Sequence, residues 1–314
     1  MRTRSLAALS VSAVALLALA GCSSGDSEAT PTTTPGAGDD LCSVAQPTGP
    51  TVEGLTIGGE VGESATLELD GPLAVETAER TLFIEGDGDE LADGDLVTYA
   101  LTIFDATSGE ETASEGYASE LLPVQVTVGS GPDQFFGCAP IGSRIVMALP
   151  ESESSPAAIW VLDVLGTGES VAWGEPQDPV DGFPTVELDE SGAPTVTVPD
   201  GDMPTEFEKA TLKKGDGEVV EAGDAVLVQY HGVSWNDGEM FDQSWGAQAF
   251  EFSTAGGVVQ GFIDAVVGET VGSQVIAVLP PSVAYGEGEI NEEDLTGQTL
   301  IFVVDILAVA KTGQ

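Results

Sequence analysis

The stretch DAVLVQYHGVSWNDGEMFDQS, residues 224–244, carries the strongest local structural signal in the chain. Residues 224–230 alternate in character and include β-branched side chains, a pattern typical of a half-buried strand. Asn236, Asp237 and Gly238 then form the kind of turn that joins two antiparallel strands. The stretch therefore predicts a β-hairpin.

The residues after this hairpin predict one short helix and further strands. Residues 261–268 place apolar side chains at helical spacing and end on a glycine, which is a common helix stop. Residues 274–279 and 299–308 are apolar and rich in β-branched side chains, so they are expected to be strands. A short helix packed on an antiparallel sheet is an α+β fold.

The same pattern occurs twice in the chain. Residues 86–110 match residues 215–239 without a gap, and residues 141–150 match 271–280. Both units close on an apolar strand. We therefore predict two copies of one domain, over 51–165 and 183–314, joined by a linker over 166–182.

The charge of the chain excludes some functions. It has 53 acidic and 8 basic residues, a formal net charge of −45. Nucleic-acid binding needs lysine and arginine to displace phosphate counterions, and attraction to an anionic membrane needs the same residues. The charge indicates solubility in an exterior environment, with capture of a basic partner as the alternative.

The N-terminal residues are typical of an export signal. Arg2 and Arg4 precede an apolar run over residues 6–20, which is shorter than the roughly 20 residues of a membrane span. Residues 19–22, Leu-Ala-Gly-Cys, resemble a bacterial lipobox. The resemblance implies a signal peptide over 1–21, a lipid anchor on Cys22 and a place on the extracytoplasmic face of the membrane, with partial release. An ordinary cleaved signal is the alternative.

The residues that follow predict a tether and one candidate disulfide. We expect a flexible tether over 22–50, since residues 23–40 lack bulky apolar side chains. Cys42 and Cys138 are the remaining cysteines, and an oxidising compartment favours a disulfide between them. Two unpaired buried thiols are the alternative.

The C-terminal unit, over about 209–308, resembles the FKBP-type peptidyl-prolyl cis-trans isomerases. The motifs that carry the resemblance occur in the family's order and spacing. They are VQYHG at 228–232, GEMFDQS at 238–244, AFEF at 249–252, VVQGF at 258–262, VGS at 271–273, LPPSVAYG at 279–286 and LIF at 300–302. The resemblance implies a curved antiparallel sheet around a short helix, so we expect two FKBP-like domains.

The resemblance also implies an apolar pocket that binds a proline ring. Tyr230, Asp242 and Tyr285 are the expected catalytic residues, with Asp242 accepting a hydrogen bond from Tyr230. The expected substrate-binding residues are Phe241, Phe252, Val258, Val259, Phe262, Leu295 and Phe302. Phe302 is equally compatible with a plain core position, and Phe250 is expected to be a core side chain.

The resemblance requires no metal, cofactor or nucleophile. The single histidine, His231, cannot form a histidine-rich metal site. The loop 286–298 departs from the family pattern, because Leu295 stands where many members have an apolar Ile-Pro pair. Its acidic residues fit a solvated face better than a calcium loop.

The first unit lacks the residues of this pocket. In the ungapped register Leu101, Thr112 and Ala113 replace Tyr230, Phe241 and Asp242. We therefore expect an inactive first unit that acts as a binding or spacing domain.

The function that the resemblance implies is isomerisation of proline-containing exported polypeptides. A non-catalytic extracytoplasmic chaperone or protein-binding lipoprotein is the alternative, and the retained Tyr230, Asp242 and Tyr285 favour the enzyme. A solute-binding lipoprotein is disfavoured, because a duplicated unit of this kind is not a hinged two-lobe receptor.

Overall fold

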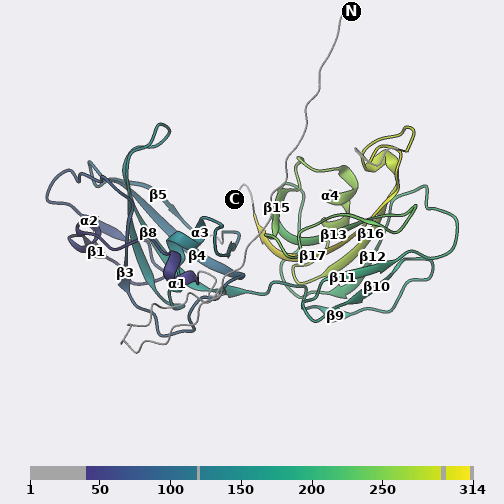
Figure 1. Ribbon diagram of the computed structural model, residues 1–314, viewed down its shortest axis with the longest axis horizontal. Helices are drawn as coiled ribbons and strands as arrows, with labels where there is room; N and C mark the ends of the chain where they lie inside the picture. The colour runs from purple at the N-terminus through teal and green to yellow at the C-terminus, as the bar shows by residue number, and fades with distance from the viewer. Residues whose placement is uncertain (1–39, 119–120, 291–294, 312–314) are drawn as a thin grey trace, which may run out of the picture. The chain divides into compact units, whose positions relative to one another are not determined.

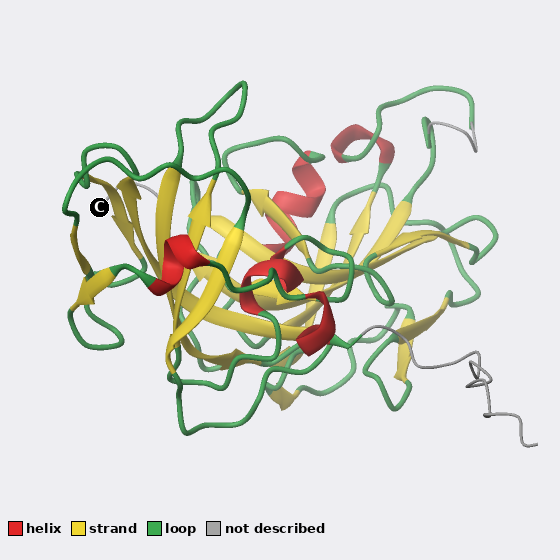
Figure 2. Ribbon diagram, turned by 60° about the vertical axis from the view of Figure 1, so that its left-hand side comes forward, coloured by secondary structure: helices red, strands yellow, loops and turns green. Residues whose placement is uncertain are grey.

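The computed structural model describes residues 40–118, 121–290 and 295–311, and these fold into antiparallel sheets with few helices (Figures 1 and 2). The predicted signal peptide, Cys22 and the acidic residues 292–294 lie outside the described residues. Within the described part of the chain, no helix is both long and apolar enough to cross a membrane.

The second half of the chain forms a seven-stranded sheet. Its strands lie in the order β14-β13-β17-β16-β12-β9, and β15 also pairs with β13. Every pairing is antiparallel. The strands are β9 (Glu175–Pro176), β12 (Glu208–Lys214), β13 (Ala225–Ser234), β14 (Met240–Gln243), β15 (Phe250–Ser253), β16 (Gln274–Leu279) and β17 (Leu300–Ala310).

The first half forms a six-stranded sheet with the same connections. Its order is β3-β7-β8-β4-β5, with β6 pairing with β4, and these pairings are also antiparallel. The strands are β3 (Glu79–Ile84), β4 (Asp95–Asp105), β5 (Glu111–Glu115), β6 (Val124–Val126), β7 (Arg144–Leu149) and β8 (Ala158–Gly168).

The register of pairing is also the same in the two sheets. Leu101 of β4 pairs with Leu162 of β8, and Tyr230 of β13 pairs with Val304 of β17. Arg144 pairs with Asp163, and Gln274 pairs with Asp305. The strands of the two halves therefore correspond residue by residue, as the ungapped repeat in the sequence requires.

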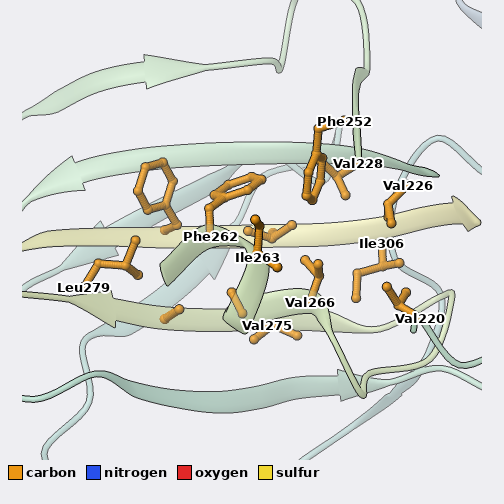
Figure 3. Close-up of a cluster of buried hydrophobic side chains, with 14 of the residues drawn as sticks. Val220, Val226, Val228, Phe252, Phe262, Ile263, Val266, Val275, Leu279 and Ile306 are labelled. Carbon is orange, nitrogen blue, oxygen red and sulfur yellow. The ribbon is translucent and has the colours of Figure 1, made fainter. Parts of the chain in front are cut away.

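Short helices accompany both sheets. They are α1 (Leu41–Val44), α2 (Pro50–Glu53), α3 (Pro132–Phe136) and α4 (Gln260–Val266), with a 3₁₀ helix η1 over Pro281–Val283. Helix α4 packs its apolar side chains, Phe262, Ile263 and Val266, into the core on one face of the second sheet (Figure 3). Gly268 follows with φ +87°, a backbone conformation that favours glycine, so the predicted helix stop is present.

The opposite face of each sheet is covered by a hairpin that the sequence pattern did not predict. Strands β10 (Thr185–Leu188) and β11 (Pro194–Thr197) pair with one another, and apolar side chains of residues 183–198 pack against the second sheet. In the first half α2 and the hairpin of β1 (Thr56–Gly58) and β2 (Thr66–Glu68) supply side chains to the corresponding core. Both faces of each sheet are therefore buried.

The predicted linker and tether are shorter than expected. Strand β8 extends to Gly168, β9 pairs with β12, and the backbone N–H of buried Ala172 donates to Asp305 Oδ2 at 2.7 Å. The stretch 166–182 is thus partly built into the second sheet. Near the start of the described residues, Leu41 of α1 is buried, so ordered structure begins inside the predicted tether. Single apolar residues in these polar stretches are buried against other parts of the fold, which the local composition does not predict.

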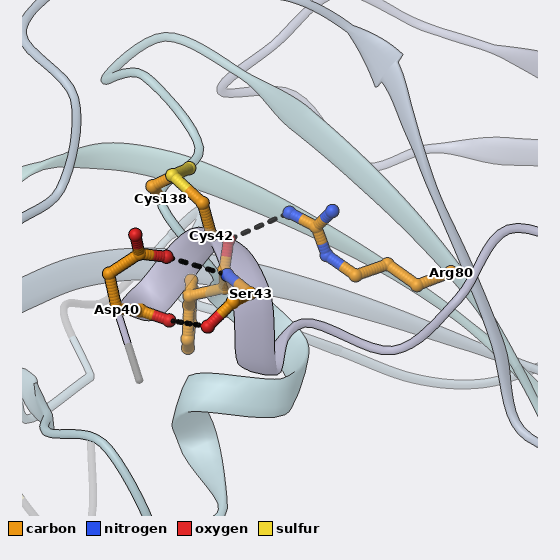
Figure 4. Close-up of a disulfide and its surroundings, with 6 residues drawn as sticks. Asp40, Cys42, Ser43, Arg80 and Cys138 are labelled. Atoms are coloured by element: carbon orange, nitrogen blue, oxygen red, sulfur yellow. Dashed lines mark hydrogen bonds between the residues drawn. A yellow bond between two sulfur atoms is a disulfide. The ribbon is translucent and has the colours of Figure 1, made fainter. Parts of the chain in front are cut away.

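A disulfide joins Cys42 to Cys138, the pair expected from the sequence (Figure 4). Cys42 lies in α1, and Cys138 lies two residues after the end of α3. Asp40 caps α1, since its side chain accepts a hydrogen bond from Ser43 N at 2.8 Å. The bond therefore ties the start of the described chain to α3.

The first sheet contains a buried ion pair. The Arg144 guanidinium donates two hydrogen bonds of 2.7 Å to the Asp163 carboxylate, and both side chains are fully buried. Its remaining donors reach the carbonyls of Gly58, Gly59, Glu60 and Glu63. At the same place in the second sheet, Gln274 Nε2 donates to Asp305 Oδ1 at 2.7 Å. The first sheet thus has a charged guanidinium at this position, which also holds the chain around β1. The second sheet has a neutral amide there.

Candidate active site

A cavity of about 450 Å³ lies between α4 and the second sheet. The side chains that line it come from six separate parts of the fold. They are Tyr230 of β13, Phe241 and Asp242 of β14, Phe250 of β15, Gly257, Val258, Val259 and Phe262 at the start of α4, Tyr285 after η1, and Phe302 of β17. The sequence-predicted residues Tyr230, Phe241, Asp242, Val258, Val259, Phe262, Tyr285 and Phe302 are brought together here.

Aromatic rings form the floor of the cavity. Phe262 meets Phe302 edge-on at 5.1 Å between ring centroids, and Phe241 meets Phe302 at 5.5 Å. Tyr230 packs against Phe262 at 5.8 Å. Edge-to-face contacts of this kind fix ring orientation beyond simple burial. Phe302 is only 4% exposed, so it serves both the core and the cavity wall, the two roles that the sequence left open.

Glycine at position 232 makes this floor possible. A Cβ atom at Gly232 of β13 would lie 2.6 Å from Phe241 Cζ and 3.0 Å from Phe302 Cε1. These distances are shorter than side chains tolerate, so the two rings approach the backbone only because no side chain is present there. The sequence comparison contained Gly232 within a motif, but its function in packing became visible only in the structure.

A hydrogen bond defines the polar edge of the cavity. Tyr230 Oη donates to Asp242 Oδ2 at 2.6 Å, and Asp242 Oδ1 accepts from Gln243 N at 2.9 Å. The strand is held at this point by Ser244, whose hydroxyl accepts from Tyr230 N at 2.8 Å. The carboxylate is therefore oriented by backbone and phenol together.

The two phenols keep their protons over a wide pH range. Burial raises the pKa of Tyr230, and the hydrogen bond to Asp242, the charge of Asp242 and Tyr285 raise it further. Burial and the charge of Asp242 also raise the pKa of Tyr285. Tyr285 is 47% exposed and lies on the cavity wall, so its protonated hydroxyl is available to a ligand carbonyl.

Two predicted substrate-binding residues lie elsewhere. Phe252 is 7% exposed and stacks behind Phe250, with centroids 5.8 Å apart and planes 11° apart. Both rings point to the same face of β15, because residues two apart in a strand share a face. Phe250 pairs across from Val228 and so lies nearer Tyr230, which puts it on the cavity wall. The prediction that Phe250 is a plain core residue is therefore corrected.

Leu295 also does not line the cavity. It packs against the apolar core of the second sheet and has φ +60°. The apolar position above the pocket that the sequence assigned to Leu295 is therefore not filled by this side chain. A loop conformation with positive φ is not readable from hydrophobicity, which is why the sequence pattern misplaced it.

The described residues show no arrangement typical of a metal centre. No group of three or more His, Cys, Asp or Glu side chains in the described part of the chain could hold an ion. His231 is buried, and its Nδ1 lies 3.0 Å from Gln243 Oε1.

Comparison with known proteins places this site in a family. Residues 216–307 match the family model of the FKBP-type peptidyl-prolyl cis-trans isomerases. A protein of Streptomyces anulatus named FK506-binding protein is 38% identical over 119 residues, which cover 37% of this chain and 96% of that protein. A Corynebacterium glutamicum protein named probable FK506-binding protein is 30% identical over 115 residues, covering 37% of this chain and 97% of its own length.

The chain therefore belongs to the FKBP-type peptidyl-prolyl cis-trans isomerase family, and it is an enzyme of the peptidyl-prolyl isomerase class. Among solved structures, FkpA from Escherichia coli is similar over 43% of this chain and 54% of its own, with 25% identity and a TM-score of 0.32.

Proposed function

We propose that the cavity around Tyr230, Asp242 and Tyr285 is the active site, and that it accelerates rotation about X–Pro bonds in exported polypeptides. The observation that carries the proposal is the aromatic floor closed on one side by the Tyr230–Asp242 hydrogen bond, all within the residues that match the family. A proline ring is apolar and fits such a floor by burial alone.

The cavity suits the chemistry of amide rotation. The C–N bond has partial double-bond character, with a barrier of about 18–20 kcal/mol, and X–Pro exchange takes about 10–100 s without a catalyst. The twisted transition state has lost amide resonance and carries less charge on its carbonyl oxygen. An apolar aromatic site therefore stabilises the transition state more than the planar ground state, which is the condition for catalysis.

The polar residues have separate tasks in this scheme. The Tyr285 hydroxyl donates a hydrogen bond to a carbonyl of the bound peptide and so orients it. Asp242 accepts from Tyr230 and keeps the phenol ring at the cavity edge. No covalent bond forms or breaks, so the residues need only bind, orient and exclude water.

The surroundings of the cavity favour basic clients. No lysine or arginine occurs between Lys214 and Lys311, and the exposed Glu287 and Glu289 closely follow Tyr285. A field of one sign raises the local concentration of oppositely charged ligands and is weakened by salt. We therefore expect Lys-Pro peptides to be isomerised faster than Glu-Pro peptides at low salt, with the difference shrinking as salt is added.

The first half of the chain supports a second role. Its strands pair in the register of the second sheet, while Leu101, Thr112 and Ala113 stand where the active-site residues would be. We propose a degenerate FKBP-like domain over about 51–165, which binds or spaces client chains without catalysis. The lipobox-like residues 19–22 support attachment through Cys22 to the extracytoplasmic face of the membrane.

An isomerisation assay on the full chain tests the enzyme proposal. The rate of cis-to-trans exchange of a proline peptide is measured with the unmodified protein, with Asp242→Ala and with Tyr285→Phe. Acceleration by the unmodified protein that falls in both variants supports the assignment. Unchanged rates in both variants would place the activity at another site.

A further inference from the structure

The helix that carries the cavity floor is very short. Helix α4 spans seven residues, Gln260–Val266, and an isolated helix of this length is unstable in water. Its last carbonyl groups have no partner within the helix and need donors from elsewhere. Phe262 projects from this helix (Figure 3) and lines the cavity, so the position of α4 sets the position of this ring in the site.

One lysine supplies those donors. Lys209 lies on β12, and its Nζ donates to the carbonyls of Asp264, Ala265 and Val267 at 3.0, 3.3 and 3.2 Å. A cation at a helix C-terminus also interacts favourably with the helix dipole. A single ammonium group therefore joins the end of α4 to a strand 55 residues earlier in the chain.

Glu269 holds this lysine in place. Its carboxylate lies 3.2 Å from Lys209 Nζ, and its other oxygen lies 3.2 Å from Lys214 Nζ. Burial raises the pKa of Glu269, but the hydrogen bond to Lys214 and the charge of Lys209 outweigh it and leave the pKa lowered. Glu269 is thus ionised at neutral pH and restrains the ammonium from one side.

The first sheet has a cation at the equivalent place. Arg80 pairs with Met147 in the register in which Lys209 pairs with Ala277. Arg80 Nε donates to Phe135 O at 2.6 Å, and its Nη2 donates to Phe136 O at 2.7 Å, at the end of α3. Burial lowers the pKa of Arg80 to about 10, so the group stays charged at neutral pH. Arg80 and Lys209 thus each donate hydrogen bonds to the carbonyl groups at the end of a short helix, α3 and α4 respectively.

We propose that Lys209 is a positioning residue for the isomerase reaction. By fixing the C-terminal end of α4, it sets the position of the Phe262 ring in the cavity. The inference rests on the proposed active site. Lys209 does not line the cavity, so its effect passes through the helix. Small displacements of a binding floor are costly, because transition-state complementarity depends on sub-ångström placement.

The test compares three variants of the full chain at a temperature where each is folded by circular dichroism. Lys209→Met keeps the aliphatic stem and removes the donors. Lys209→Arg restores them with the group that Arg80 uses in the first sheet. Lys214→Met is the matched control, since it removes a charge from Glu269 without touching α4.

We expect Lys209→Met to lower kcat/KM by about tenfold per folded molecule, and Lys209→Arg to recover most of that loss. Lys214→Met should stay within about twofold of the unmodified protein. Activity of folded Lys209→Met equal to that of the unmodified protein would overturn the inference and leave the proposed function standing. An inactive unmodified protein would instead refute the proposed function.

A second variant covers the case in which Lys209→Met does not fold. Lys209→Gln keeps one donor group but lacks the charge and the reach to contact three carbonyls. We expect a partial loss of kcat/KM at unchanged folded fraction. Full activity of folded Lys209→Gln would overturn the inference.

Discussion

The two sheets are built on one pairing scheme, yet they differ at the positions that form the cavity. In the second sheet, Gly232 pairs with Asp242, and the absent side chain leaves room for Phe241. In the first sheet, Ile103 pairs with Ala113, and the residue beside Ala113 is Thr112. The bulky side chain has moved from one strand to its neighbour. Without a glycine at position 103, the first sheet lacks the gap on β4 into which an aromatic ring of β5 would pack.

The two sheets also differ in their buried polar side chains. The first sheet has a fully buried ion pair, Arg144–Asp163, where the second has Gln274 and Asp305. The second sheet also has a carboxylate, Asp242, at the edge of its cavity, where it accepts a hydrogen bond from Tyr230. Both sheets therefore contain a buried aspartate, but they differ in the charge of its side-chain partner.

The largest expected effect comes from converting the second cavity to the pattern of the first. The triple variant Tyr230→Leu, Phe241→Thr and Asp242→Ala removes the aromatic floor and the hydrogen bond together. We expect isomerisation no faster than the uncatalysed exchange of about 10–100 s.

The triple variant is measured with a proline-peptide assay and with thermal unfolding. The matched control makes the reverse change at one position of the first sheet, Ala113→Asp, which should leave the rate unaltered. Substantial residual activity in a folded triple variant would show that these three positions do not account for the difference between the two sheets.

The next effect concerns the buried ion pair of the first sheet. Arg144→Met should lower the free energy of unfolding by about 3–5 kcal/mol, because Asp163 is left charged and buried without its partner. Denaturant unfolding measures this loss. Isomerase activity below the unfolding transition should be retained, since the cavity lies on the second sheet.

Gln274→Met in the second sheet is the counterpart of this change. Gln274 is uncharged, so its replacement removes a neutral hydrogen-bond donor from Asp305 and not a charged partner, and a smaller loss of about 1–3 kcal/mol is expected. A larger loss for Gln274→Met than for Arg144→Met would reverse the ranking of the two networks.

A smaller effect is expected from replacing Gly232, which stands where the first sheet has Ile103. Gly232→Ala places a Cβ within 2.6 Å of Phe241, so Phe241 and Phe302 must shift. The cost in unfolding free energy should be about 1–3 kcal/mol, with a clear fall in kcat/KM. Ile103→Ala in the first sheet should not affect kcat/KM. Unimpaired activity in Gly232→Ala would show that the floor adapts.

The smallest effect is expected when the pH is varied, because kcat/KM should stay constant. The pKa values of Tyr230 and Tyr285 are raised, so both phenols remain protonated as the pH rises from 7 to about 10. The stability that the protonated phenols contribute is fully present below the unfolded pKa of about 10 and is lost only as pH rises through the higher folded values. A rate profile on the full chain should therefore be flat in this range. A fall in kcat/KM with a midpoint below pH 9 would contradict the assigned environment of the phenols.

Local patterns in the sequence predicted much of the second sheet. The hairpin at Asn236–Gly238, the helix ending before Gly268 and the strands 274–279 and 299–308 are present with small shifts of their ends. The motif residues from Tyr230 to Phe302 predicted most of the cavity wall. These signals are local, since turn residues, helical spacing and strand alternation act over a few neighbours.

Contacts between distant segments were not predictable in the same way. The position of the hairpin β10–β11 depends on apolar side chains that pack on the far face of the sheet. The course of residues 166–182 depends on the pairing of β9 with β12 and on the hydrogen bond from Ala172 N to Asp305. Phe250 and Phe252 share a face, and only their distance from Tyr230 separates the cavity residue from the core residue. Leu295 is partly buried against the core, in a loop whose backbone conformation its hydrophobicity does not specify.

The sequence by itself determined the duplicated strand pattern, the family of the second half and the residue types of its cavity, because these depend on local periodicity and on motif order. The tertiary structure alone decided that Gly232 leaves room for Phe241, that Phe250 is on the wall, and that Lys209 reaches the end of α4. The physical reason is that packing and hydrogen bonding act over a few ångströms in space, between residues that the chain separates by tens of positions.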